Sequence, residues 1–462
     1  MLGASRMELQ MITRQDNPSM SAQADVIVIG GGANGALITF ELAKRGYQVI
    51  TLEKGALGNG SSSRSAACIR AQFGDPRNVL GMVYAEWFFE NFYSILGVPE
   101  EEQNEWLFEQ NGYLFLYEDP GQIEDSAKSK ASAKAWLEAL KAAHMQQKLG
   151  LPVEILDPST VHARYPHINP ELLIGATFCP TDGFLNHDLI YLRGFEMAQR
   201  HYGAQVFTNT EVIGATRAKD GTITTLHTTS GDFSAKWIVN ATNAWAPRLS
   251  KLLGGMELPI TPFKRYLYWV QPHSSVFSDD SWKKLPFTIF GMGPDRGSYC
   301  RPHHNELMYG WAHEAEPEPQ FSDEDQDRIG AGFHPDSASG DRDYWLEFRL
   351  NVNDFSELLA NTGRARATAG YYGQTPDHQP IIDVDTQVSN LIHAVGFSGH
   401  GLMMSPVTAQ VVAALVDGRG EIVNRQICLP PMFRPEMTKL MLDCSHFSAT
   451  RDFYAQKEGA YI

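Results

Sequence analysis

The stretch ADVIVIGGGANGALITFELAKRGYQVITLEK, residues 24–54, decides the fold. It begins with Val26-Ile27-Val28-Ile29, an uninterrupted β-branched run that is typical of a parallel strand buried on both faces. An amphipathic helix follows and ends at Gly46, and a second strand over residues 49–52 leads into Glu53. Strand, helix and strand in this order predict a βαβ unit of the dinucleotide-binding type.

Three glycines between the first strand and the helix have the spacing G-x-G-x-x-G, namely Gly30, Gly32 and Gly35. The first makes a tight turn, the second lets the backbone approach a pyrophosphate, and the third lets helix and strand pack closely. The helix N-terminus then faces the phosphate charge, and Glu53 can accept the ribose hydroxyls. An acid at this place favours an unphosphorylated ribose, which indicates FAD or NAD rather than NADP.

Composition limits the class of protein. The chain has 462 residues, 43% of them hydrophobic, which is enough for two or more domain-sized cores. A formal net charge of -16 disfavours nucleic acid or an anionic membrane surface as a partner. Five scattered cysteines without C-x-x-C indicate a reduced compartment, no disulfide framework and no zinc site. We expect a cytoplasmic protein with a polar, disordered leader and no membrane span, since no run approaches ~18 apolar residues.

The nucleotide-binding signature is split between the two ends of the chain. A buried-strand pattern ends at Asn240, and strand, glycine loop and helix recur over residues 391–416. Between them, residues 263–363 are rich in aromatics, prolines and acids and lack a βα rhythm. A long cofactor such as FAD explains two distant glycine loops better than NAD does. The predicted division is a leader (1–23), an FAD-binding domain (24–78, 152–262 and 364–425), a substrate domain (79–151 and 263–363) and a C-terminal arm (426–462).

Several motifs together carry a resemblance to a known family. They are the opening fingerprint, SSSRSAA at 61–67, VNATNAWAP at 239–247, TPDHQPIID at 375–383 and GFSGHGLMMSP at 396–406. Over residues 24–420 the chain resembles the D-amino-acid oxidase / sarcosine oxidase family of FAD-dependent oxidoreductases. The resemblance implies an α/β (α+β) fold, in which a Rossmann-like FAD-binding domain built from discontinuous segments joins a substrate domain with a mixed or antiparallel sheet. It also implies oxidation of the C–N bond of an amino acid or secondary amine, with hydride passing to flavin N5 and the imine then hydrolysed.

The resemblance also assigns cofactor residues. The serine loop lies along the pyrophosphate and flavin, a mid-chain strand contacts adenine, and the C-terminal glycine loop lies by the flavin pyrimidine. Some relatives carry a covalent cysteine where Gly370 stands, so we expect non-covalent FAD. The expected FAD-binding residues are Gly30, Gly32, Asn34, Gly35, Glu53, Lys54, Ser61, Ser62, Ser63, Arg64, Ser65, Ala66, Val212, Gly370, Gly399, His400, Gly401, Leu402 and Met403.

On the substrate side, the family's I-R-x-x-[YF]-G stretch is present as residues 69–74, which implies that Arg70 holds a substrate carboxylate. In KRYLYWV, residues 264–270, alternation places Arg265 and Tyr266 on opposite faces, and the pattern leaves open which face meets the flavin. A tyrosine of the pair Tyr371 and Tyr372, with Tyr372 preferred, either closes the pocket or packs as a core aromatic. Met403 stands where relatives have lysine, and His400 is expected to be structural rather than a general base. The expected catalytic set is Arg70, Arg265, Tyr266, Tyr372 and Met403.

The histidines at 303, 304 and 313 are too loosely arranged with carboxylates to predict a metal site. Met308 matches a lysine that sarcosine oxidases use for oxygen reactivity, which favours a dehydrogenase over an oxidase. The electron acceptor is then a quinone, an electron-transfer protein or, less favoured, oxygen. Two alternatives stay open, namely oxidation of a 2-hydroxy acid on the same flavin geometry and a low-turnover flavoprotein assembly factor. The substrate's identity and the oligomeric state stay open too.

Overall fold

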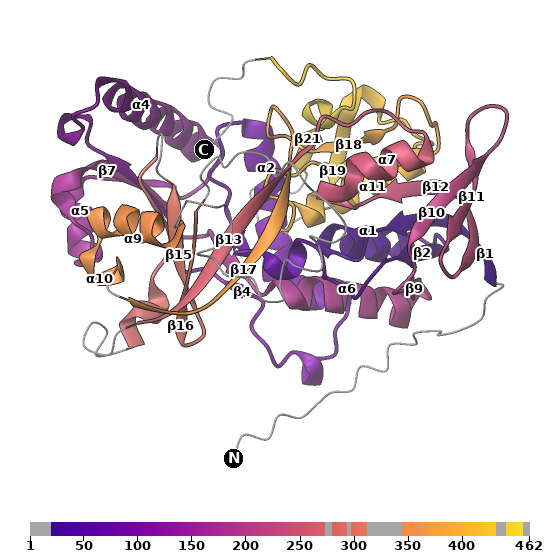
Figure 1. Ribbon diagram of the computed structural model, residues 1–462, viewed down its shortest axis with the longest axis horizontal. Helices are drawn as coiled ribbons and strands as arrows, with labels where there is room; N and C mark the ends of the chain where they lie inside the picture. Colours follow the sequence, from indigo (N-terminus) through magenta and orange to yellow (C-terminus); the bar gives the residue numbers. More distant parts are fainter. Residues whose placement is uncertain are drawn as a thin grey trace.

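The computed structural model describes residues 20–272, 280–292, 297–311, 344–360, 362–430 and 440–455. Figure 1 shows two lobes side by side, each built on an eight-stranded sheet. Two long strands, β13 (Thr261–Pro272) and β17 (Thr362–Gln374), pair antiparallel and run through the middle of the molecule. The predicted α/β (α+β) fold class, with a Rossmann-like lobe and a second mixed sheet, is confirmed.

The first lobe grows from the opening stretch. β1 (Met20–Ile29), α1 (Ala33–Lys44) and β2 (Val49–Leu52) form the predicted unit, and β1 pairs parallel with β2. The sheet order is β10-β11-β12-β1-β2-β9, and β19 pairs with β12 and β18. The remaining bounds are β9 (Gln205–Phe207), β10 (Val212–Arg217), β11 (Ile223–Thr228), β12 (Gly231–Asn240), β18 (Ile381–Val384) and β19 (Leu391–Val395).

Helices pack on this sheet because packing buries their apolar faces away from water. α1 packs against α6 (His187–Tyr202) and α11 (Ser405–Asp417), and α11 packs against α2 (Pro76–Glu90). Eleven of the thirteen residues of α11 are buried, as expected for a helix enclosed on all sides. The Asp75 carboxylate caps α2 by accepting from the backbone N–H of Arg77 at 2.9 Å. α7 (Ala246–Leu253) and the short α3 (Phe92–Leu96) complete the lobe.

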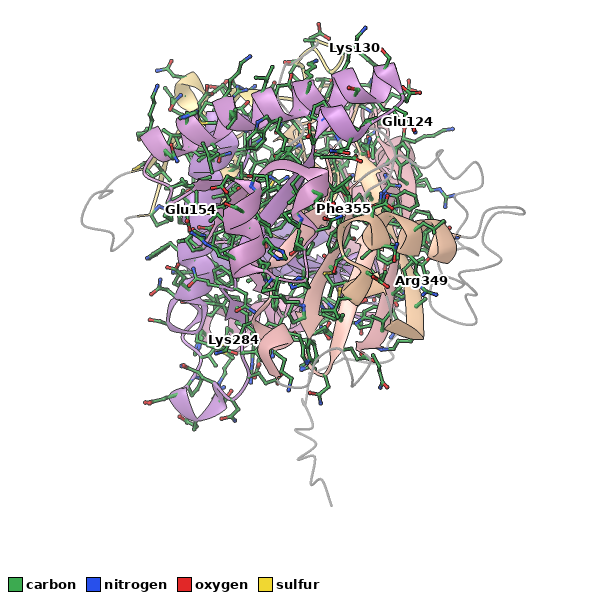
Figure 2. The ribbon with its side chains drawn as sticks, turned by 90° about the vertical axis from the view of Figure 1, so that its left-hand side faces the viewer. Glu124, Lys130, Glu154, Lys284, Arg349 and Phe355 are labelled. Atoms are coloured by element: carbon green, nitrogen blue, oxygen red, sulfur yellow. The ribbon has the colours of Figure 1, made fainter. Side chains whose placement is uncertain are left out.

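The second sheet has the order β17-β13-β16-β15-β14-β5-β7-β6. All its pairs are antiparallel except β14 with β5, so the sheet is mixed. Figure 2 shows α4 across the top of this lobe, with Lys130 on its outer side. The bounds are β5 (Tyr113–Glu118), β6 (Glu154–Leu156), β7 (Leu173–Cys179), β14 (Phe287–Phe290), β15 (Ser298–His303), β16 (Glu306–Trp311), α4 (Ser126–Lys148), α5 (Pro158–Arg164), α9 (Tyr344–Phe355) and α10 (Glu357–Ala360).

The described residues also form two small sheets, one of three strands and one of two strands near the C-terminus. β3 (Cys68–Ile69) and β4 (Phe108–Glu109) flank β8 (Gly183–Leu185), and β20 (Gln426–Leu429) pairs with β21 (Leu440–Asp443). The domain bounds given above stay a prediction. The strand pairing places β6 and β7, from the 152–262 range, and β17 as far as Gln374 in the second sheet. The leader lies largely outside the described residues, as do parts of the 263–363 range and of the C-terminal arm.

Candidate functional site

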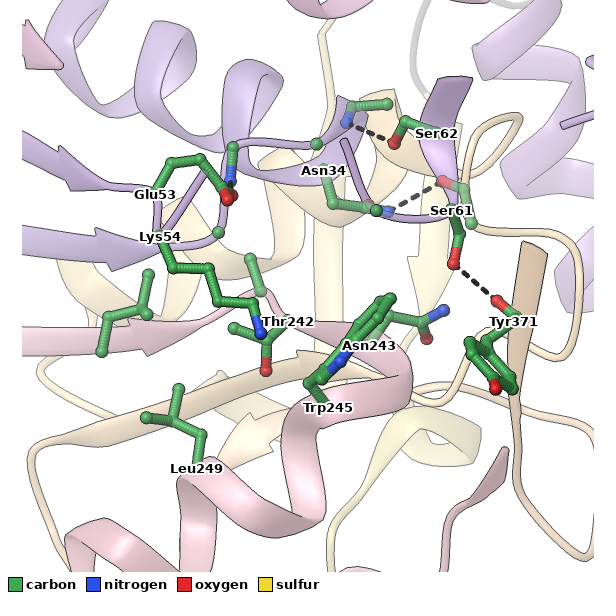
Figure 3. A pocket seen from close by; sticks show the side chains of 18 of the residues that line it. Asn34, Glu53, Lys54, Ser61, Ser62, Thr242, Asn243, Trp245, Leu249 and Tyr371 are labelled. Atoms are coloured by element: carbon green, nitrogen blue, oxygen red, sulfur yellow. Dashed lines mark hydrogen bonds between the residues drawn. The ribbon is translucent and has the colours of Figure 1, made fainter. Parts of the chain in front are cut away.

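A cavity of about 390 Å³ lies where the carboxyl ends of β1 and β2 meet β13 and β17. Its volume falls within the range of small-molecule and cofactor sites. Figure 3 shows side chains from three separate parts of the chain around it, among them Glu53, Trp245 and Tyr371. Most of the predicted residues line this cavity, namely Gly30, Gly32, Asn34, Glu53, Lys54, Ser61, Ser62, Arg64, Ser65, Val212, Arg265, Gly370, Tyr372, Gly399, Gly401 and Leu402.

The glycine turn has the geometry that its spacing predicts. Gly30 has a φ of 123°, and a Cβ there would lie 2.7 Å from the carbonyl oxygen of Ala241. A Cβ on Gly35 would lie only 1.9 Å from the carbonyl oxygen of Gly30, so helix and strand approach too closely for any side chain. The N-cap of α1 is Gly32, whose lack of a capping side chain leaves the helix N-terminus to other partners. This turn is a cradle suited to a pyrophosphate.

Glu53 closes the turn from the end of β2. Its carboxylate accepts hydrogen bonds from the backbone N–H of Gly31 at 2.6 Å and of Gly55 at 2.8 Å. Burial raises the pKa of Glu53 above its usual range, and the two N–H groups oppose that rise. The carboxylate is therefore held in a fixed orientation at the cavity edge, where it can accept further hydrogen bonds from ribose hydroxyls.

Segments far apart in sequence are tied together around the cavity. The Ser62 hydroxyl accepts from the backbone N–H of Ala33 at 3.0 Å, and Ser61 donates to the carbonyl of Tyr371 at 2.5 Å (Figure 3). Asn34 donates to the carbonyl of Gly401 at 2.9 Å. The serine loop, the opening turn and the C-terminal glycine loop thus form one wall, as the split signature predicts.

Seven of the residues predicted for the site lie outside this lining: Gly35, Ser63, Ala66, Arg70, Tyr266, His400 and Met403. Met403 is 1% exposed and packs in the core of the first lobe. The Tyr266 side chain packs against the hydrophobic core of the second lobe and against a small cluster that contains Tyr371. The neighbouring Arg265 lines the cavity instead. This resolves the face of the 264–270 strand that alternation left open.

Arg70 sits just behind the glycine loop. Its side chain is buried, with its guanidinium carbon 4.0 Å from the centre of the Phe73 ring and 5.3 Å from that of Phe115. It donates to the carbonyl of Gln72, and its Nη2 lies 3.5 Å from Nε2 of His400. In the part of the chain that the structure describes, no carboxylate lies within ion-pair distance of this guanidinium. A buried cation needs compensating contacts, and the described ones are the aromatic rings and the Gln72 carbonyl.

The environment of His400 decides its charge. Burial, and the nearby charges of Arg70 and His378, lower the pKa of His400 to about 3. The imidazole is therefore neutral and weakly basic at physiological pH, which agrees with a structural role.

Tyr372, on β17, packs near the C-terminal glycine loop and forms a side-chain hydrogen bond with Tyr299. A Cβ on Gly399 would lie 2.5 Å from the Tyr372 ring, so the glycine lets this aromatic approach the loop.

Several lining residues were not predicted. They include Thr210, Glu211, Thr242, Asn243, Trp245, Arg248, Leu249, Leu252 and Phe397. Thr242, Asn243 and Trp245 lie within VNATNAWAP, which marked the family but was not assigned residue by residue. Arg301 was missed altogether, although its buried side chain donates to the carbonyl of Ala66 at 2.7 Å and so holds the end of the serine loop. No sequence signal identified it, since a single arginine in a strand has many structural uses.

Two negative findings apply to the described ranges. There, no group of three or more His, Cys, Asp and Glu side chains is placed to hold a metal ion. No helix within them is both long and apolar enough to cross a membrane.

The cavity, its glycine turn and its terminal acid define a dinucleotide-dependent oxidoreductase fold, and comparison with known proteins identifies the class. The family described as FAD dependent oxidoreductase (DAO) matches residues 25–415. The chain belongs to this family, so the recognition made from its motifs is confirmed. FAD is accordingly its cofactor, and the glycine cradle, the helix N-terminus and Glu53 fit that group.

Individual relatives are distant but cover most of the chain. "FAD-dependent oxidoreductase domain-containing protein 1" of Xenopus laevis is 26% identical over 443 residues, covering 87% of this chain and 81% of that protein. Glycine oxidase of Geobacillus kaustophilus (strain HTA426) is 27% identical over 406 residues, covering 86% and 94%. The crystal structure of L-proline dehydrogenase from P. horikoshii superposes with a TM-score of 0.70 at 27% identity, covering 87% and 95%. The chain is thus similar to enzymes that act on amino acids, and it is an FAD-dependent amine or amino-acid oxidoreductase by family.

Proposed function

We propose that this enzyme oxidises the C–N bond of an amino acid or a carboxylate-bearing secondary amine, as a dehydrogenase rather than an oxidase. The observation that carries the proposal is Arg70, a buried guanidinium without a carboxylate partner among the described residues. A substrate carboxylate supplies the missing anion through a paired, charge-assisted contact. The similarity to a glycine oxidase and an L-proline dehydrogenase supports the same substrate class.

The chain's own residues perform binding and orientation. In this proposal the carboxylate end reaches Arg70, which lies outside the described cavity lining and next to His400, and Arg265 and Tyr372, which line the cavity, limit where the amine end can lie. FAD, when bound, accepts the hydride from the carbon that carries the amine. The protein's task is then to hold a neutral amine with that C–H bond aimed correctly, which is a matter of position rather than of a strong base. A neutral His400 is consistent with a reaction that needs no strong protein base, because its low pKa makes the imidazole a poor proton acceptor.

The choice of dehydrogenase rests on Met308. Its side chain is fully buried on β16, within the cluster formed by Tyr113, Phe115 and Tyr299. An apolar side chain thus stands where the oxidases that the chain resembles have a lysine for oxygen reactivity. Electrons then leave to a quinone or an electron-transfer protein. Non-covalent attachment of FAD is supported by Gly370, which stands where some of the resembled enzymes carry a covalent cysteine. In addition, none of the five cysteines lines the cavity.

The experiment that tests the activity is anaerobic bleaching of the bound flavin by a panel of amino acids, secondary amines and 2-hydroxy acids. Bleaching by amines alone is the expected result. Bleaching by hydroxy acids alone would favour the 2-hydroxy-acid alternative, and no bleaching by any compound would favour the assembly-factor alternative. The reduced protein is then mixed with air-saturated buffer or with a soluble quinone. Fast reoxidation by quinone and slow reoxidation by oxygen are expected, and the reverse order contradicts the dehydrogenase proposal.

We further propose a cytoplasmic location, which the five unpaired cysteines support.

A further inference from the structure

A fully buried acid–histidine pair lies beneath the cofactor cavity. Nε2 of His393 lies 2.8 Å from Oδ2 of Asp385, and neither side chain is exposed. The Asp385 carboxylate also accepts from the backbone N–H groups of Met256 at 2.7 Å, Gln387 at 2.6 Å and Val388 at 2.8 Å. Burial by itself raises the pKa of Asp385, but His393 and these N–H groups hold it below its usual range. The carboxylate is thus ionised, and His393 donates to it from Nε2.

The second ring nitrogen of His393 reaches the next strand. His393 on β19 and Asn240 on β12 are direct neighbours in register, and Nδ1 of His393 lies 3.3 Å from Nδ2 of Asn240. The Thr242 backbone N–H donates to Oδ1 of Asn240, so the Asn240 amide points its NH₂ group towards Nδ1 of His393, which accepts from it. The Asn240 oxygen is thereby turned the other way, towards the cavity wall. Nδ2 of Asn240 also lies 3.5 Å from the carbonyl oxygen of Ala246, a longer contact, so His393 is the nearer of the two acceptors that hold this orientation.

That amide oxygen holds the turn that lines the cavity. It accepts from the Thr242 hydroxyl at 2.7 Å and from the Thr242 backbone N–H at 3.1 Å. Thr242 faces the cavity in Figure 3. The carbonyl oxygen of the adjoining Ala241 packs against Gly30. The backbone N–H of Ala241 donates to the carbonyl of Ile29 at 2.9 Å.

The other end of the same turn reaches the C-terminal glycine loop. Asn243 accepts from the backbone N–H groups of Gly396 at 3.1 Å and Phe397 at 3.2 Å. The 240–243 turn therefore contacts both glycine loops and links them, in addition to the direct hydrogen bond from Asn34 to Gly401. A fixed turn lowers the ordering cost that FAD binding would otherwise carry.

We propose that His393 and Asp385 are positioning residues for FAD, acting through Asn240 to hold the 240–243 turn in its binding geometry. Neither side chain lines the cavity, so both act only through the relay. The inference concerns the cofactor alone and does not depend on which substrate the enzyme oxidises.

The test measures the Kd for FAD by quenching of FAD fluorescence during titration with the apoprotein, beside the thermal unfolding midpoint of the apoprotein. His393→Phe removes both ring contacts and should raise the Kd at least tenfold. His393→Gln can donate to Asp385 and accept from Asn240, so it should return the Kd to within about threefold of the wild type. The matched control is Thr39→Val, which breaks a buried 2.6 Å hydrogen bond to Thr51 in the same lobe, away from the cavity lining. It should lower the unfolding midpoint and leave the Kd within twofold.

A double variant separates relay from general destabilisation. If His393 acts through Thr242, then His393→Phe should raise the Kd less in a Thr242→Val background than in the wild type. If the effects of the two substitutions on the Kd for FAD multiply in the double variant, the proposal is overturned. It is also overturned if His393→Phe and Thr39→Val lower the thermal unfolding midpoint equally and change the Kd equally. If His393→Phe does not fold, Thr242→Val alone decides. It removes the hydroxyl bond to Asn240, keeps the bond from the Thr242 backbone N–H and changes one lining side chain, so it should raise the Kd about threefold, and an unchanged Kd would refute the relay.

Discussion

Nη2 of Arg70 lies 3.5 Å from Nε2 of His400, so a cation and a neutral imidazole lie next to each other just outside the cavity lining. Burial and this cation, with His378, explain why the pKa of His400 falls to about 3. In the proposed function, Arg70 offers charge to the substrate carboxylate, whereas His400 offers a hydrogen-bonding atom without offering basicity.

The first prediction concerns Arg70. Arg70→Ala should lower kcat/KM for a carboxylate substrate about 100-fold or more, because an arginine–carboxylate contact in a desolvated site contributes roughly 3 kcal/mol. Arg70→Lys keeps the charge but loses the planar fork, so it should recover only part of the loss. Steady-state kinetics with a substrate found by flavin bleaching measure the effect, and absorbance near 450 nm checks that FAD stays bound. Unchanged kinetics in Arg70→Ala would remove this residue from the site.

The second prediction concerns the pH dependence set by His400. Its folded pKa lies below the ordinary value of about 6.5, so the unfolded chain takes up a proton between roughly pH 6.5 and pH 3 while the folded protein does not. Stability should therefore be intact above pH 6.5 and fall as the pH drops, by at most about 1.4 kcal/mol per pH unit from this group. Urea unfolding at pH 7 and pH 5 should show a smaller loss in His400→Gln than in the wild type.

The same variant tests catalysis. His400→Gln should leave the shape of the kcat/KM profile between pH 6 and pH 9 unchanged, since a neutral, weakly basic ring contributes no ionisation there. A lost inflection in that range would assign His400 the role of general base.

The third prediction concerns Glu53. Glu53→Gln keeps one acceptor for the backbone N–H of Gly31 or Gly55 but turns an NH₂ group towards the other, so the turn loses a contact and gains a repulsion. The Kd for FAD should rise at least tenfold, about 1.4 kcal/mol. Glu41→Gln, at the opposite end of α1 in an ion pair with Arg45, is the matched control and should bind FAD normally. Equal binding by both variants would argue against a ribose-holding role for Glu53.

The sequence predicted those features that depend on local spacing. β1, the glycine turn, α1 and Glu53 follow from hydrophobic period and backbone geometry, and the second glycine loop follows from the same pattern near the C-terminus. Contacts made across the chain were beyond such reasoning. Asn240 meets His393 and Arg301 meets Ala66 only because strands distant in sequence pair in space. The alternating strand at 264–270 similarly required the pairing of β13 with β17 before Arg265 could be placed towards the cavity.

The fourth prediction concerns Gly35. Gly35→Ala should prevent FAD binding or lower its affinity more than 100-fold, because the added Cβ would lie 1.9 Å from a backbone oxygen and α1 would have to move away from β1. Gly214→Ala is a control on β10 of the same sheet, where the nearest atom to an added Cβ lies 3.9 Å away. FAD titration and circular dichroism of both variants check this. Normal FAD affinity in Gly35→Ala would mean that the close approach of helix and strand is not required.

The last prediction concerns Met308 and the electron acceptor. Met308→Lys places a cation inside the aromatic cluster of Tyr113, Phe115 and Tyr299, so it should cost stability, roughly 3 kcal/mol or more. If an apolar residue here is what slows the reaction with oxygen, the same variant should reoxidise in air at least tenfold faster after anaerobic reduction. Met308→Leu preserves the apolar volume and should behave as the wild type in both respects. Stopped-flow reoxidation in buffers of known oxygen concentration measures the rates, with a soluble quinone as the parallel acceptor. A lysine variant that folds and binds FAD but reacts with oxygen no faster would show that Met308 does not set the choice of acceptor, and the dehydrogenase assignment would then rest on the wild-type reoxidation rates alone.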